Sequence, residues 1–166
     1  HLVEEVAQGG DVLVAQELPG VGRPAGVRGD GDEALRLAEQ TDDQGLQIAQ
    51  RAFFGFGAVL AGRLREGLAS CEWAFEHLPA DPELGKIYSG YSPYLGLLDV
   101  YAWILIRSGR VPEARVAIAK VEALARERGD FEILTWLGLP NSEMAVACAD
   151  PLAARAYAET SLASSV

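Results

Sequence analysis

The sequence predicts an all-α protein built from antiparallel helix hairpins, and three observations lead to this prediction. Residues 59–67 return 47 positions later as residues 106–114, with Gly62 superimposed on Gly109. Apolar side chains recur at helical spacing from Asp32 onward. Capping residues and prolines interrupt these apolar runs, as they do where one helix ends and the next begins. Such a repeated helix pair buries its apolar face by stacking on a copy of itself. We expect its small residues to lie at close helix contacts: Gly62, Gly67, Gly109 and Ala114.

The segment before the helices differs in composition from the rest of the chain. Residues 1–31 contain seven of the eighteen glycines, together with Pro19 and Pro24. Glycine costs about 1 kcal/mol and proline about 3 kcal/mol inside a helix, so we expect an irregular N-terminal segment. Within it, residues 11–18 fit a strand and a helical turn equally well. Its apolar side chains are expected to fold back over the first helices or to mediate a homodimer. These side chains are Leu2, Val3, Val6, Val12, Leu13 and Val14. The ends of the helical stack are a second surface through which a homodimer could form.

Each helix from Asp32 onward has its own start or stop signal. Asp32 is the expected N-cap of the first helix. Asp42 or Asp43 is expected to start the second helix, which ends near Gly62. A third helix is expected over about residues 65–78, because two prolines follow it closely.

The strongest start signal is the pair Ser92 and Pro93, a capping hydroxyl followed by a proline at the first helical position. This fourth helix is expected to end at Ser108, just before Gly109. The remaining helices are expected to begin near Pro112, Asp130 and Asp150. The chain therefore reads as successive pairs of antiparallel helices.

The repeated unit resembles the tetratricopeptide repeat, in which small residues and a turn glycine recur at fixed positions of a helix pair. The first copy has Gly55, Gly62, Gly67, Cys71, Ala74 and Pro79 at these positions, the second has Ala102, Gly109, Ala114, Ile118 and Val121, and a weaker third has Ser142, Ala149, Ala154, Ala158 and Ser161. The copies are 47 and then 40 residues apart, whereas the usual period of the family is about 34.

The resemblance implies a repeat domain over residues 32–166 that stacks into a right-handed superhelix, an α-solenoid. Its repeats span about residues 48–81, 95–128 and 135–166, and a half repeat, residues 32–43, precedes them. The lengthened repeats are similar to those of large bacterial signalling ATPases, including regulators fused to nucleotide cyclase domains. This similarity implies that the chain belongs to a larger bacterial signalling protein.

The same resemblance implies which residues bind a partner. In tetratricopeptide arrays the first helix of each pair lines a concave surface. Carrying the register over predicts that this surface binds a helix or an extended peptide of a protein partner. The expected partner-binding residues are Phe56, Val59, Asp99, Trp103, Ile106, Trp136 and Glu143, with Ala52 and Leu139 beside them. On this prediction the chain is not an enzyme and needs no cofactor or metal.

Composition limits the classes of partner. Apolar residues make up 49% of the chain and charged residues 23%, which is the balance of a folded domain. The net charge of −10 disfavours binding to nucleic acid or to an anionic membrane. The longest apolar stretch, residues 94–106, contains Asp99 and is shorter than the ~20 residues that cross a bilayer. We therefore expect neither nucleic acid nor a membrane as a partner.

A cytoplasmic location is expected on two grounds. The first six residues contain two glutamates and lack the apolar core of a secretory signal. Cys71 and Cys148 lie far apart in apolar helical contexts, which is typical of small buried side chains in a reducing compartment. The chain does not begin with Met and is expected to be a fragment of a longer protein.

Two weaker motifs point to other functions. Residues 20–25 fit the pattern G-x-G-x-x-A, but Pro24 and the glycines after it disfavour the helix that a dinucleotide site requires. Residues 90–94 match G-x-S-x-G except for its last glycine. Only His1 and His77 are available to complete a serine triad. A small hydrolase of the esterase or lactonase type, with an unrecognised active site, is the main alternative.

Overall fold

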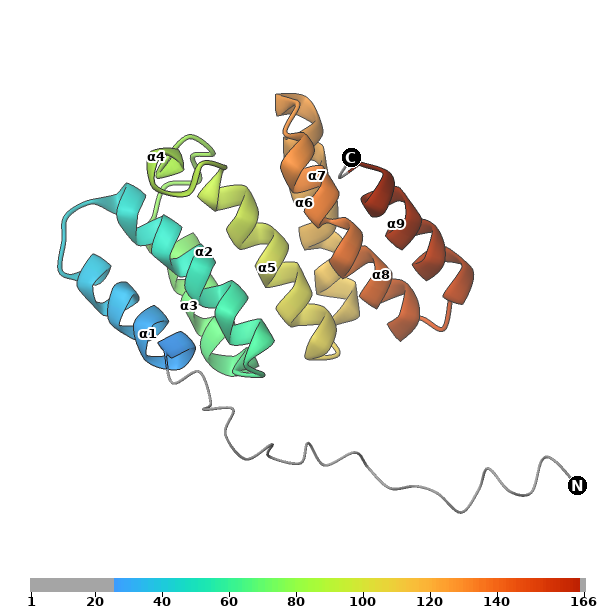
Figure 1. The fold of residues 1–166 in the computed structure, drawn as a ribbon, viewed down its shortest axis with the longest axis horizontal. Helices are drawn as coiled ribbons and strands as arrows, with labels where there is room; N and C mark the ends of the chain where they lie inside the picture. Colours follow the sequence, from blue (N-terminus) through green and yellow to red (C-terminus); the bar gives the residue numbers. More distant parts are fainter. Residues whose placement is uncertain (1–25, 165–166) are drawn as a thin grey trace, which may run out of the picture.

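The computed structural model describes residues 26–164, and all regular structure in this range is helical (Figure 1). The helices are α1 (Gly26–Glu39), α2 (Gln44–Leu60), α3 (Leu64–His77), α4 (Lys86–Ser89), α5 (Pro93–Arg107), α6 (Val111–Arg128), α7 (Phe131–Trp136), α8 (Gly138–Ala147) and α9 (Pro151–Ser164). The prediction of an all-α protein is confirmed. The expectations for residues 1–25, including the apolar contacts and the homodimer, lie outside the described residues.

The capping residues act where the sequence places them. Each accepts a hydrogen bond from the backbone N–H three residues later, which satisfies one of the free donors at the start of the helix. The distances are 3.0 Å from Leu46 to Asp43, 3.4 Å from Leu95 to Ser92, 3.2 Å from Ile133 to Asp130 and 3.0 Å from Ala153 to Asp150. The predicted starts of α2, α5, α7 and α9 are therefore confirmed.

The internal repeat is visible in the backbone of the turns. Gly62 and Gly109 both adopt the left-handed conformation, with φ of 72° and 75°. After each glycine an arginine N–H donates back into the helix, from Arg63 to the Ala58 carbonyl at 2.8 Å and from Arg110 to the Leu105 carbonyl at 2.9 Å. This pattern is the Schellman motif, which ends a helix and reverses the chain.

The weaker third copy repeats the same turn without a glycine. Ala149 has φ of 56°, and the N–H of Asp150 donates to the carbonyl of Ala145 at 2.8 Å. A left-handed conformation is unfavourable for alanine because its Cβ approaches the backbone. The three turns therefore share one geometry, and the third holds it at some cost in conformational energy.

The prediction that Gly62 and Gly109 lie at close helix contacts is wrong. A Cβ atom at either position would meet nothing within 4 Å, so these glycines are required by their positive φ and not by lack of space. The same prediction is confirmed for Gly67, where a Cβ would lie 3.0 Å from side-chain atoms of both Ala58 and Ile104. Ala114, the matching residue of the next repeat, is fully buried.

Two helix boundaries differ from those expected. Asp32 was predicted to be an N-cap, but α1 already begins at Gly26 and Asp32 lies inside it, paired with Arg63 at 3.0 Å. The expectation of an irregular segment is therefore wrong for residues 26–31, which are helical. The helix expected after Asp130 is divided, because α7 and α8 are separated at Leu137. Pro140 accounts for the division: it lacks an N–H, and its ring would clash with the carbonyl four residues earlier.

The helices form two layers around α5. In Figure 1, α1, α2, α5 and α8 lie side by side, and α3 and α6 pack behind them. α5 contacts helices on both sides, α2 and α3 on one and α6, α7 and α8 on the other. Leu95, Leu97, Ile104 and Leu105 of this helix are completely buried. α5 is thus the centre of the hydrophobic core, and it positions the side chains described below.

A buried arginine fixes α1 and α3 to α2. The Arg51 side chain is only 5% exposed, and its Nη2 atom donates to Glu39 of α1 at 2.5 Å. Its Nη1 atom donates to Ser70 of α3 at 3.2 Å, and the guanidinium lies 3.7 Å from the centre of the Trp73 ring. Burial lowers the pKa of Arg51 more than Glu39 raises it. These contacts set the position of the first helix of the described chain.

We predict that Ala114→Leu destabilises the fold, because Ala114 is fully buried at the start of α6. Overpacking of a close contact costs about 1–3 kcal/mol, and urea unfolding measures this loss directly. The matched control is Ala123→Leu on the exposed face of the same helix, which is expected to change stability by less than about 0.5 kcal/mol. Equal stability of both variants would contradict the close packing described here.

The turn geometry leads to a reciprocal pair of predictions. Gly109→Ala is expected to destabilise the protein by about 1 kcal/mol, since alanine disfavours a φ of 75° although space for its methyl group is free. Ala149→Gly relieves the same conformational cost and is expected to stabilise the protein by up to about 1 kcal/mol. Thermal unfolding of both variants checks the signs. Destabilisation by Ala149→Gly would show that the third turn is not strained.

Candidate functional site

A pocket of about 600 Å³ opens between α2, α5, α7 and α8, within the range of ~300–1,000 Å³ typical of ligand sites. We call it the aromatic pocket, after its five aromatic side chains, which line it together with one carboxyl group. It is lined by Ala52, Phe53, Phe56, Tyr91, Gly96, Asp99, Val100, Trp103, Thr135, Trp136, Leu139 and Ser161. Most of this lining is apolar, which is typical of sites that bind an organic group.

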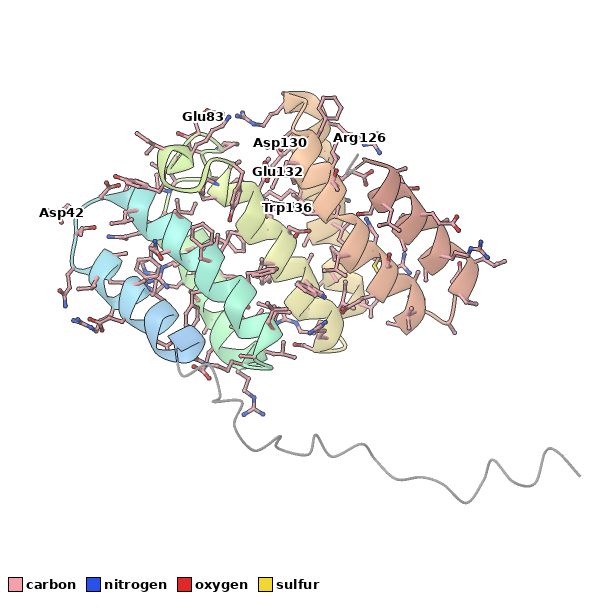
Figure 2. All side chains as sticks on the ribbon, in the orientation of Figure 1. Asp42, Glu83, Arg126, Asp130, Glu132 and Trp136 are labelled. Carbon is pink, nitrogen blue, oxygen red and sulfur yellow. The ribbon has the colours of Figure 1, made fainter. Side chains whose placement is uncertain are left out.

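Aromatic contacts join the helices that form the walls. Tyr91, just before α5, packs edge-on against Phe53 of α2 and Trp136 of α7, with ring centres 6.1 Å and 4.7 Å apart. Trp136 extends from α7 (Figure 2), and it is one of the residues that line the pocket. Phe56 of α2 is tilted against Trp103 of α5 at 6.0 Å. Phe53 and Phe56 remain 44% and 48% exposed, so the pocket has an apolar rim that is open to solvent.

Asp99 is the charged residue of this lining. Its side chain is 7% exposed, and its Oδ1 atom has no hydrogen-bond partner among the residues that the structure describes. Burial raises the pKa of Asp99 to about 7, since an unpaired carboxylate is poorly stabilised away from water. Burial also raises the pKa of Tyr91, and the charges of Glu132 and Asp99 add to this shift.

An ion pair between Arg107 of α5 and Glu143 of α8 lies beside the pocket and connects the two helices. Arg107 donates to both carboxylate oxygens of Glu143, at 2.9 Å and 2.6 Å, and its guanidinium lies 4.6 Å from the Trp103 ring centre. The bond to Arg107 lowers the pKa of Glu143, and the nearby Trp103 indole contributes to this shift. Among the described residues, the indole N–H has no hydrogen-bond acceptor of normal geometry.

The structure brings together four of the seven residues that the sequence assigns to partner binding. Phe56, Asp99, Trp103 and Trp136 line the aromatic pocket, although Trp103 is only 4% exposed. The other three lie elsewhere: Val59 and Ile106 are in the hydrophobic core with 1% and 6% exposure, and Glu143 is paired with Arg107.

Sequence reasoning missed two aromatic members of the site. Phe53 lies three residues before Phe56 on α2, and this helical spacing indicates that the two side chains share a face. Tyr91 comes from the loop before α5, for which the repeat gives no register. No signal in the sequence places Tyr91 in the pocket.

No protein-family model, curated protein or solved structure matches this chain. Within residues 26–164, no helix has the length and apolarity needed to cross a membrane. In the same range, His, Cys, Asp and Glu side chains form no cluster suited to a metal ion. Cys71 and Cys148 are both free; Cys71 is buried as expected, but Cys148 is exposed, so the expectation of burial is wrong for Cys148. Burial raises the pKa of Cys71 to about 12.

The titration of Asp99 predicts a pH-dependent stability. Below pH of about 4, the carboxyl group is protonated in both the folded and the unfolded chain, so its titration does not change the free energy of unfolding. Between about 4 and about 7 only the unfolded chain ionises, so the free energy of unfolding falls as the pH rises. Each unit of pKa difference corresponds to about 1.4 kcal/mol, which sets an upper limit of about 4 kcal/mol for the loss.

Asp99→Asn removes this titration while it preserves the shape of the side chain. The variant is expected to be more stable than the parent protein at pH of about 8, and this advantage should shrink toward pH of about 5. Urea unfolding of both proteins at the two pH values measures the difference. Glu132→Gln, which removes an exposed carboxylate beside the pocket, is the matched control. An advantage independent of pH would contradict the raised pKa.

Proposed function

We propose that this chain is a tetratricopeptide-like interaction module that binds a peptide or a helix of a protein partner at the aromatic pocket. The observation that carries the proposal is the pocket itself, whose apolar walls come from three successive helix pairs. Aromatic side chains in a recess are the groups that contribute most to binding energy at interfaces. On this proposal the chain performs no catalysis and acts by presenting a surface.

The solenoid arrangement is supported by the equivalence of the three turns. The hairpins α2–α3, α5–α6 and α8–α9 each reverse at a residue in the left-handed conformation. Repetition of one turn geometry gives successive hairpins similar orientations, which is the basis of a superhelical stack. We propose that α2, α5 and α8 line its inner, concave surface and that the chain is part of a cytoplasmic bacterial signalling protein.

The dimensions of the site favour a segment of chain as the ligand. Phe53, Phe56 and Leu139 are each about half exposed at the rim, so apolar side chains on either side of an anchor would also be covered. An amphipathic helix or an extended peptide presents apolar residues at such spacing. The described part of the chain has no strand to which a peptide could add, so side-chain pockets must supply the specificity.

A hydrolase is the second candidate, favoured by one observation. Asp99 has a pKa of about 7 in an apolar pocket, and general acids and bases have pKa values in this range. Three hydroxyl side chains, Tyr91, Thr135 and Ser161, also line the pocket. Hydrolysis of p-nitrophenyl esters or lactones by the purified chain, with loss of activity in Asp99→Asn, would replace the interaction module by this candidate.

The proposed function is tested by selecting phage-displayed peptides on the immobilised chain. Phe56→Ala is expected to weaken binding of the selected peptides by about tenfold to thirtyfold, as truncation of an aromatic anchor costs about 2 kcal/mol. Phe131→Ala is the matched control, because Phe131 is 79% exposed and lies outside the aromatic pocket. Calorimetry measures both affinities.

Two results would overturn the proposal. One is a failure to enrich any peptide on the folded chain. The other is an equal loss of affinity with Phe56→Ala and Phe131→Ala, which would place binding on another surface.

A further inference from the structure

We infer that the aromatic pocket binds a lysine side chain of the partner segment, with the ammonium group on Asp99 and the aliphatic stem between the aromatic walls. This inference rests on the proposed function and names the chemistry of the anchor. Three observations support it: the buried carboxyl group of Asp99 has no partner among residues 26–164, aromatic side chains line the same pocket, and the equivalent residues of the other repeats are apolar.

The carboxyl group of Asp99 lacks what a buried acid requires. Buried charges in proteins are paired or hydrogen-bonded, since transfer from water is otherwise costly. In the described part of the chain no ion pair reaches Asp99, and its Oδ1 atom has no hydrogen-bond donor. Asp99 nevertheless lines an open pocket, so a ligand can reach it. A cation from outside the chain is the partner that this group lacks.

The fold does not need a carboxylate at this position. The equivalent residues are Ala52, which lies 47 residues before Asp99, and Leu139, which lies 40 residues after it. All three line the aromatic pocket, and two of them are apolar. The helix pair therefore forms with an apolar side chain at this place. Asp99 adds a negative charge to the pocket that hairpin packing does not explain.

The walls suit a cation on an apolar stem. Phe53, Phe56, Tyr91, Trp103 and Trp136 line the pocket, and the faces of aromatic rings attract cations. The methylene groups of lysine pack well on such rings. Lysine fits better than arginine, because an ammonium has three donors to satisfy and a guanidinium has five. The net charge of −10 further favours a basic partner.

The first test uses n-pentylammonium as a lysine mimic and n-pentanol as its neutral counterpart. Nuclear magnetic resonance follows the indole N–H signals, because Trp103 and Trp136 line the pocket whereas Trp73 packs under Arg51 and serves as an internal control. Pentylammonium is expected to shift the signals of Trp103 and Trp136 only. Asp99→Asn should weaken its binding at least about tenfold and leave pentanol binding unchanged.

Glu132→Gln is the matched control, since it removes the same charge from an exposed position on α7. It is expected to change pentylammonium binding less than about twofold, because exposed charges attract a cation only weakly. Equal losses in Asp99→Asn and Glu132→Gln would show nonspecific attraction and overturn the inference. Equal binding of pentanol and pentylammonium to the parent protein would also overturn it.

The second test compares peptides selected on the parent chain with analogues in which lysine is replaced by norleucine. We expect the selected peptides to contain lysine beside large apolar residues. Replacing this lysine by norleucine should lower the affinity for the parent chain at least about tenfold and should not lower the affinity for the Asp99→Asn variant in this way. Selected peptides without a basic residue would overturn the lysine anchor while the proposed function stands. If pentylammonium binds but no peptide can be selected on the folded chain, the pocket is a site for small amines, and both the inference and the proposed function are overturned.

Discussion

The burial of α5 on every side is the constraint on which the rest of the structure depends. Thirteen of its fifteen residues are buried, and its neighbours α2, α3, α6, α7 and α8 cover it all round. A helix without a solvent-facing side has no place where a charge is well hydrated. The carboxyl group of Asp99 therefore faces the aromatic pocket, and the same packing that forms the core brings Phe56 and Trp136 to its walls.

Backbone geometry at the turns explains how unequal repeats give similar hairpins. The copies are 47 and 40 residues apart, yet the chain reverses through the same hydrogen bond after Ala58, Leu105 and Ala145. Between the first two hairpins the added residues lie in the loop that contains α4, whereas only residues 129–130 join α6 to α7. The turns within the hairpins stay constant, and the connections between hairpins vary. Tyr91 joins the pocket from one of these variable connections.

The fold was more predictable from the sequence than the site was. Caps such as Ser92 and Asp130 act within three residues, so local sequence specifies them. A glycine, in contrast, signals either a tight helix contact or a positive φ, and this ambiguity explains the wrong prediction for Gly62. The register of the repeat correctly predicted that Phe56 and Asp99 lie on one surface. It cannot distinguish the residues that line the pocket from those in the core beneath them. The pairing of Glu143 with Arg107, 36 residues away, has no local signal.

The two properties of Asp99 have a common physical cause. Apolar surroundings make the ionised carboxylate costly when the pocket is empty, and the same low polarity strengthens its attraction to a bound cation. An apolar residue, as found at Ala52 and Leu139, avoids the cost but provides no specificity. A partner that brings an ammonium group would recover the energy that Asp99 loses on folding. Binding at this site would thus be selective because the unbound site is unfavourable, and the stability of the module would rise with occupancy.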